Sequence, residues 1–262
     1  MPTSNRWTPE QLLAAFSLYC RLPFGKFHQH NPEIIHLAQA IERTPSAVAM
    51  KLCNFASLDP SLSQRGLEGA SQADRELWNA FHVHPNDIAL QAEAAYDNAL
   101  EKLTPVTPRT DPNDNSFEVK DIPEGPTEQL RLTKTRRLQS FFRASVLSSY
   151  EYRCAISGLE VLDLLIASHI IPWSADEQRR ADPRNGLCLN SLYDKAFDRG
   201  LITFDENWRV LLSPRLATHS DNPFHRSTLL EIAGRPLQFP TRFPPDPQAM
   251  HHHRQHIFRK EN

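Results

Sequence analysis

The sequence predicts an α+β protein in two parts: a helical N-terminal domain and a C-terminal domain built on a strand–loop–strand–helix unit. Three observations support this. Apolar residues recur at helical spacing through most of residues 7–102. Further along the chain, short apolar runs alternate with Gly and Asn turns, as in short strands. Between them, residues 104–127 hold five prolines, which predicts a linker. We therefore expect domains at 1–103 and 128–262.

Composition and charge are those of a globular protein. Hydrophobic residues make up 40% of the 262 residues and charged residues 23%, so a core of normal size can form. No apolar run reaches the about 18 residues of a membrane helix, and the first residues do not resemble a secretory signal. We therefore expect a cytoplasmic protein without membrane contact. The four cysteines are far apart and form no CxxC pair, so we interpret them as reduced thiols.

The net charge of −2 does not exclude a local basic patch. Residues 131–143 carry five basic side chains and no acidic one. Two interpretations stay open for this segment: a solvated helix face, or a DNA-binding surface. The candidates for DNA contact within it are Arg136, Arg137 and Arg143.

The N-terminal part begins with a helix that Thr8 is expected to cap. Asn31-Pro32 and Thr44-Pro45 are start signals for two further helices, and the tight turn between these resembles a helix-turn-helix. In that case residues 46–54 form the recognition helix. Its candidates to face DNA are Ser46, Met50, Lys51 and Asn54. A small bundle for packing or dimerisation is the alternative.

A strand–loop–strand–helix pattern covers residues 161–200. The run VLDLLIA predicts a strand that ends at Ser168-His169, and a polar loop then closes at Asn185-Gly186. LCL predicts a second strand, and SLYDKAFDRG predicts a helix that Gly200 ends. Farther on, LITFDENWRVLLS indicates a hairpin that turns at Asp205–Asn207.

Asp194 and Asp198 are four residues apart, so a helix sets both carboxylates on one face, about one turn apart. Two carboxylates at that spacing repel one another. Either a cation lies between them or basic neighbours screen them, with Lys195 and Arg199 as candidates. A solvated acidic stripe is the alternative, as a buried core histidine is for His169.

Taken in order, these segments resemble the His-Asn-His (HNH) endonuclease family, whose ββα-metal core has this strand–loop–strand–helix order. HIIPWS resembles the family's first-histidine segment, and DPRNG resembles its asparagine turn. LYDKAFDRG falls where the third histidine or its acidic substitute belongs. Upstream, RRLQSFFRASVLSSYEYRCAISG is similar to the lead-in of a subgroup of restriction-type endonucleases. The resemblance covers roughly residues 136–215.

The resemblance implies a role for each candidate residue. His169 would be the general base, because an imidazole with a pKa near 6.5 accepts a proton from water at neutral pH. Asn185 would hydrogen-bond backbone across the loop and so fix the orientation of the histidine. Asp194 and Asp198 would hold one divalent cation, Mg²⁺ or Mn²⁺, which suits hard carboxylate oxygens.

The sequence departs from the family pattern in two places. Ser168 stands where many relatives carry an acid or a histidine as a further metal ligand, and a hydroxyl binds metal poorly. Many relatives also carry two CxxC pairs for a structural zinc. The corresponding positions here are Cys154, Ser157, Asn190 and Tyr193. We therefore expect no structural zinc, and packing by Phe197, Trp173 and Leu192 instead.

The resemblance implies a metal-dependent endonuclease that hydrolyses phosphodiester bonds of double-stranded DNA. The helical domain would position the DNA, and restriction of foreign DNA would be its use. A homodimer would allow both strands to be cut. A DNA-binding regulator with a degenerate, non-cleaving HNH fold is the alternative, which Ser168 favours; a structural or interaction module is the third. Three consecutive histidines, 251–253, are interpreted as a surface cluster, with metal binding as the alternative.

Overall fold

The computed structural model describes residues 6–62, 69–103, 126–219 and 221–260. It divides into two compact units, Met1–Ala144 and Ser145–Asn262, and the architecture is α+β as predicted. The predicted linker lies outside the described residues except for its last two, which begin a helix. No helix in the described part of the chain is long and apolar enough to cross a membrane.

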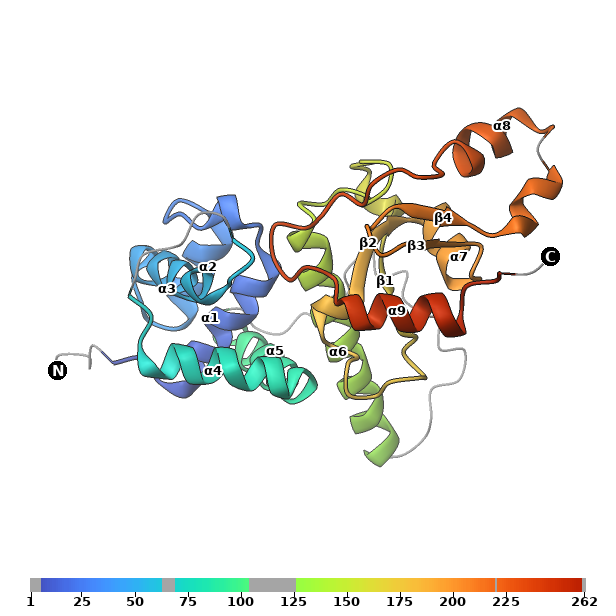
Figure 1. The fold of residues 1–262 in the computed structure, drawn as a ribbon. Coiled ribbons are helices and arrows are strands. Elements are labelled where there is room, and N and C mark those ends of the chain that lie inside the picture. The colour runs from blue at the N-terminus through green and yellow to red at the C-terminus, as the bar shows by residue number, and fades with distance from the viewer. Residues whose placement is uncertain (1–5, 63–68, 104–125, 220, 261–262) are drawn as a thin grey trace. The chain divides into compact units, whose positions relative to one another are not determined.

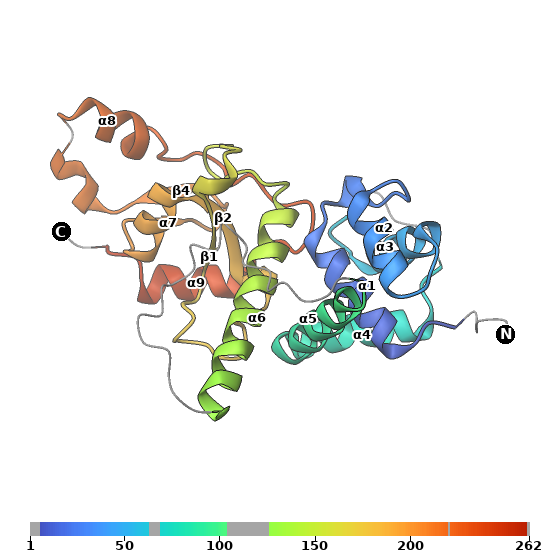
Figure 2. The same ribbon diagram turned by 180° about the vertical axis from the view of Figure 1, so that it is seen from behind.

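The first unit is helical (Figures 1 and 2). Thr8 caps the first helix as predicted, and the structure adds a capping box with Gln11. Pro85 starts a new helix, because a proline fits the first helical turn but not the helix interior. The helices are α1 (Pro9–Arg21), α2 (Pro32–Ala40), α3 (Pro45–Leu58), α4 (Gln72–Val83), α5 (Pro85–Glu101) and α6 (Pro126–Ser149), the last of which crosses the boundary between the units.

An aromatic cluster forms the core of the first unit. The Phe16 ring is fully buried and meets the rings of Phe55 and Phe81 edge-on, at centroid distances of 5.3 and 5.0 Å. Phe141 of α6 extends the cluster, since its ring lies 5.7 Å from that of Phe81. Such edge-to-face pairs add to the stabilisation that burial of the rings provides.

The structure corrects two of the predicted DNA contacts on α3. Lys51 is buried, and its ammonium donates to both carboxylate oxygens of Asp74 at 2.8 and 2.9 Å, with the Trp7 ring 5.0 Å away. Asn54 is buried as well. Both side chains therefore lie on the packed face of α3, and only Ser46 and Met50 of the predicted set are exposed.

The second unit contains two antiparallel hairpins with a short helix between them in sequence (Figure 1). In the first hairpin, Leu165 pairs with Asn190 and His169 pairs with Gly186. The turn of the second hairpin is the predicted one, where Asp205 accepts hydrogen bonds from the backbone of Asn207 and Arg209. The elements are β1 (Leu165–His169), β2 (Gly186–Asn190), α7 (Ser191–Asp198), β3 (Ile202–Phe204), β4 (Val210–Leu212), α8 (Pro223–His225) and α9 (Pro247–His256).

The predicted first strand is wrong at its start. Residues Leu162–Leu164 form a 3₁₀ turn, and β1 begins only at Leu165. Val161, Leu162 and Leu164 are 43–49% exposed, so this end of the apolar run lies at the surface, before the first paired residue of β1. Leu192, expected in the core, is 38% exposed.

The C-terminal helix α9 packs along β3 and holds the end of α7 in place. His253 is buried, stacks on the Phe197 ring at 3.7 Å, and donates from Nε2 to the Phe197 carbonyl. Gly200 ends α7 with a φ of 66°, and a Cβ there would lie 2.0 Å from the Ile257 carbonyl oxygen. Glycine is therefore required at this position by both backbone conformation and space.

Candidate active site

His169 is the last residue of β1, immediately before the β1–β2 loop. Its Nε2 lies 3.0 Å from the Arg180 carbonyl oxygen, and its ring meets Trp173 edge-on at 5.6 Å. Because a carbonyl only accepts, Nε2 carries the proton, and the lone pair of the neutral ring is on Nδ1.

The pKa of His169 is about 4: burial lowers it most, the hydrogen bond to the Arg180 carbonyl partly offsets this by raising it, and the positive charge of Arg180 lowers it. The imidazole is therefore neutral at pH 7. A neutral ring whose orientation is fixed can accept a proton from water.

Asn185, at the end of the β1–β2 loop, forms hydrogen bonds with Ile171 at the beginning of the same loop. Its Oδ1 accepts from the Ile171 N–H at 2.8 Å, and its Nδ2 donates to the Ile171 carbonyl at 3.1 Å. The Asn185 carbonyl accepts from the Ile170 N–H at 2.9 Å. The side chain is buried, so these contacts fix the backbone immediately after His169.

Asn185→Ala is expected to lower the free energy of unfolding by about 3 kcal/mol, because two buried backbone groups of Ile171 lose their partner and each costs roughly 1–3 kcal/mol. Urea unfolding followed by circular dichroism measures this. Asn207→Ala, in the exposed turn after β3, is the matched control and should change stability by less than about 0.5 kcal/mol. Equal effects of the two substitutions would contradict the role given to Asn185.

Contacts that the sequence did not point to hold the rest of the loop. Asp182 is buried and pairs with Arg179 and Arg184. The Arg180 guanidinium lies 4.9 Å from the centre of the Trp173 ring and donates to the Trp173 carbonyl. The acceptor for His169 is a backbone carbonyl, which any residue type supplies, so no sequence signal marks it.

Asp194 and Asp198 lie one turn apart on α7, as predicted. Asp194 is half-buried, and burial together with the negative charge of Asp198 raises its pKa to about 6. The Asp198 side chain is exposed; partial burial raises its pKa, while Lys195 and Arg199 lower it. The two carboxylates therefore repel one another; Lys195 partly screens both of them, and Arg199 screens Asp198 as well.

Ser168 lies beside this pair. It sits opposite Leu187 in the β1–β2 ladder, is buried, and its hydroxyl is close enough to Asp194 to lower the pKa of that carboxyl. No aligned hydrogen bond to the Ser168 Oγ forms within the described residues. Two repelling carboxylates and a buried unsatisfied hydroxyl form an oxygen-rich set that suits a hard divalent cation.

The set is small for a metal site. Among the described residues, no three His, Cys, Asp or Glu side chains are grouped closely enough to hold an ion. A cation at Asp194 and Asp198 would therefore keep several water or DNA ligands, as Mg²⁺ usually does.

The four positions that correspond to zinc ligands in relatives lie together and are joined by hydrogen bonds. Asn190 caps α7 by accepting from the Tyr193 N–H at 2.9 Å, and its side chain donates to the Ser157 hydroxyl at 3.3 Å. The Asn190 N–H points to the Cys154 sulfur at 3.3 Å. This network ties the segment before β1 to the start of α7. Phe197, expected in the core, is fully buried and stacks on His253.

The predicted basic residues divide between the two units. Lys195 and Arg199 are exposed next to Asp198, within the candidate site. Arg136, Arg137 and Arg143 belong to the first unit; Arg136 is exposed, Arg137 pairs with Asp97 at 3.5 Å, and Arg143 is half-buried.

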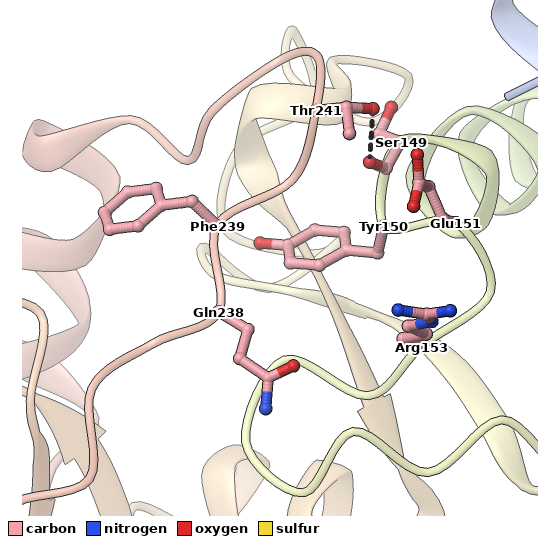
Figure 3. Close-up of a pocket in the computed structure, with 7 residues that line it drawn as sticks. All are labelled: Ser149, Tyr150, Glu151, Arg153, Gln238, Phe239 and Thr241. Carbon is pink, nitrogen blue, oxygen red and sulfur yellow. Dashed lines mark hydrogen bonds between the residues drawn. The ribbon is translucent and has the colours of Figure 1, made fainter. Parts of the chain in front are cut away.

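A separate shallow pocket of about 400 Å³, part of it open to solvent, lies between the end of α6 and residues 238–241. Figure 3 shows Tyr150 at its centre and the Thr241 hydroxyl bonded to the Ser149 carbonyl, at 3.1 Å. None of the predicted site residues lines it. The pocket lies where residues 238–241 pack against the end of α6, and it is separate from the candidate site.

Comparison with known protein families gives a match to the family described as HNH endonuclease, at residues 154–205. These residues form an HNH endonuclease domain, and they contain β1, β2, α7, β3 and all of His169, Asn185, Asp194 and Asp198. The match covers about a fifth of the chain. No curated protein matches the chain.

Proposed function

We propose that the HNH endonuclease domain at residues 154–205 hydrolyses phosphodiester bonds of double-stranded DNA in a metal-dependent reaction, with 5′-phosphate and 3′-hydroxyl ends as products. The observation that carries the proposal is the state of His169. Its Nε2–H is committed to the Arg180 carbonyl and its ring is neutral at pH 7, which is the state that a general base requires.

In this proposal, Asp194 and Asp198 hold one Mg²⁺ or Mn²⁺ ion, with the Ser168 hydroxyl behind Asp194. When bound, the ion neutralises the scissile phosphate and stabilises the leaving 3′ oxygen. Lys195 and Arg199 flank the carboxylates and offer positive charge to neighbouring phosphates, because both side chains are exposed.

The protein side of the reaction is proton transfer and orientation. Nδ1 of His169 accepts the proton of the attacking water, and the Arg180 carbonyl, which accepts from Nε2, stabilises the imidazolium that forms. Asn185 and Ile171 hold the backbone next to His169, so that the ring keeps its orientation while its charge changes.

The acid side of the pH–rate profile should be set by Asp194 rather than by His169. A carboxyl must lose its proton to bind a cation, and the pKa is about 6 for Asp194 but about 4 for His169. At subsaturating Mg²⁺ we expect the rate to fall below pH 6 by about tenfold per pH unit. Saturating Mg²⁺ should move this limb to lower pH.

Ser168→Ala tests whether Asp194 sets the acid side of the pH–rate profile. The Ser168 hydroxyl lowers the pKa of Asp194, so its loss should move the acid limb to higher pH. Single-turnover cleavage rates between pH 4.5 and 8 measure the shift. A rate at low Mg²⁺ that stays constant from pH 7 down to 4.5, in both the wild type and Ser168→Ala, would contradict control by Asp194.

A DNA-binding regulator with a non-cleaving HNH fold is the second candidate, and the observation that favours it is Ser168 in place of a stronger metal ligand. Supercoiled plasmid incubated with purified protein and Mg²⁺ or Mn²⁺ distinguishes the two. Nicked or linear plasmid with religatable ends supports the nuclease. Salt-dependent DNA binding without cleavage under any of these conditions supports the regulator.

We further propose that the helical unit positions the DNA and that the chain acts against foreign DNA. Exposed Ser46 and Met50 on α3 and exposed Arg136 on α6 are the surface groups that support a DNA contact there. A homodimer on DNA would place one site on each strand. Light scattering of the protein–DNA complex, together with the ratio of nicked to linear product, tests the dimer.

A further inference from the structure

The four histidines of α9, His251, His252, His253 and His256, have different environments. His253 is buried, and both of its ring nitrogens are bonded, to the Phe197 carbonyl and the Thr203 hydroxyl. His251 is exposed. His252 and His256 are one turn apart, and their ring centroids lie 4.5 Å apart.

We propose that His252 and His256 form a binding site for a transition-metal ion of the Zn²⁺ class, distinct from the carboxylate pair on α7. Two imidazoles at i and i+4 on one helix face point to the same side and can ligate one ion. Imidazole nitrogen suits Zn²⁺, Co²⁺ and Ni²⁺, whereas Mg²⁺ prefers oxygen.

Two further observations single out this pair. The His252 Nδ1 is enclosed and has no hydrogen-bond partner within the described residues, so this nitrogen is not committed to another protein group. The two rings are also in electrostatic contact, since burial and then the neighbouring His256 lower the pKa of His252. Neutral imidazoles are the form that binds metal.

Asp176 supplies negative charge to the site. It belongs to the β1–β2 loop and is close enough to raise the pKa of His252. The same loop is already tied to the start of α9, because Arg179 pairs with Asp246 at 2.9 Å and the Asp246 N–H donates to the Arg184 carbonyl. We assign Asp176 a contact through a metal-bound water, with other waters completing the coordination.

An ion at this site would connect α9 to the loop that orients His169, because the Arg180 carbonyl lies in that loop. A ligand that binds the folded protein but not the unfolded chain raises the unfolding temperature. Zn²⁺ should therefore stabilise the second unit even when the α7 carboxylates are absent.

The experiment uses the full chain with Asp194→Asn and Asp198→Asn, which removes the carboxylate pair, after dialysis against a chelator. Titration with Zn²⁺ against a chromogenic competitor should show one ion per chain and a rise in unfolding temperature. His252→Ala and His256→Ala should each weaken binding by at least about tenfold, since each removes a ligand. His251→Ala, on the same helix but outside the pair, is the matched control and should bind as the parent does.

Asp176→Asn should weaken Zn²⁺ binding by a smaller factor, and unchanged affinity would overturn the role of Asp176. Unfolding temperatures without metal, equal in all variants, show that the helix is intact. The proposal is overturned if the parent binds no Zn²⁺, or if His251→Ala loses as much affinity as His252→Ala and His256→Ala. The result does not depend on DNA cleavage, so it stands or fails separately from the proposed nuclease function.

Discussion

His169→Ala is expected to lower the single-turnover rate of plasmid cleavage by about 10²- to 10⁴-fold, the usual contribution of a general base. The loss should come from the chemical step, because His169 lies at the end of β1 and its Nε2 bonds the backbone of the following loop rather than a DNA-facing group. DNA affinity, measured by fluorescence anisotropy without divalent metal, should remain within about twofold of the wild type, since no phosphate contact is removed.

His225→Ala is a suitable control for this substitution. His225 also bonds a backbone carbonyl through Nε2, that of Leu216, and lies in the same unit outside residues 154–205. It should cleave at close to the wild-type rate. If His169→Ala cuts as fast as His225→Ala, water is not activated by His169 and the proposed mechanism is wrong.

The local order of elements around the site could be predicted because each step has its own signal. Gly200 marks the end of α7, and the four-residue spacing of the aspartates places both on one helix face. The backbone contacts of Asn185 were implied by the resemblance to the HNH family, and the structure has them.

Other features depend on tertiary contacts that a sequence does not encode locally. Lys51 has the residue type and spacing of a recognition-helix contact, but the partner that buries it, Asp74, is twenty-three residues away. The predicted start of β1 was wrong because an apolar run looks the same in the sequence whether it is buried or exposed. Val161 and Leu164, at the start of this run, are exposed. The prediction of a surface cluster at 251–253 holds for His251 but is wrong for His253, which is buried against Phe197.

Asp194→Asn should abolish metal-dependent cleavage, with a rate at least about 10²-fold below the wild type, because the amide keeps the shape of the side chain but not its charge. The half-buried Asp194 lies beside Ser168, whereas Asp198 is exposed and screened by Lys195 and Arg199. Asp198→Asn should therefore lose less activity, and higher Mn²⁺ should restore part of it. Glu206→Gln, an exposed acid in the β3–β4 turn, is the control.

The same substitution should make the metal-free protein more stable, which distinguishes a functional carboxylate from a structural one. The pKa of Asp194 is about 6 in the folded state, above its ordinary value of 3.8, so the ionised group opposes folding at neutral pH, and this cost declines as pH falls from about 6 towards 4. Removing it should raise the free energy of unfolding at pH 7.5 by on the order of 1 kcal/mol, allowing for partial exposure to solvent. Mg²⁺ should stabilise the wild type but not Asp194→Asn. A variant that is inactive and also less stable than the wild type would indicate that Asp194 supports the fold rather than the metal.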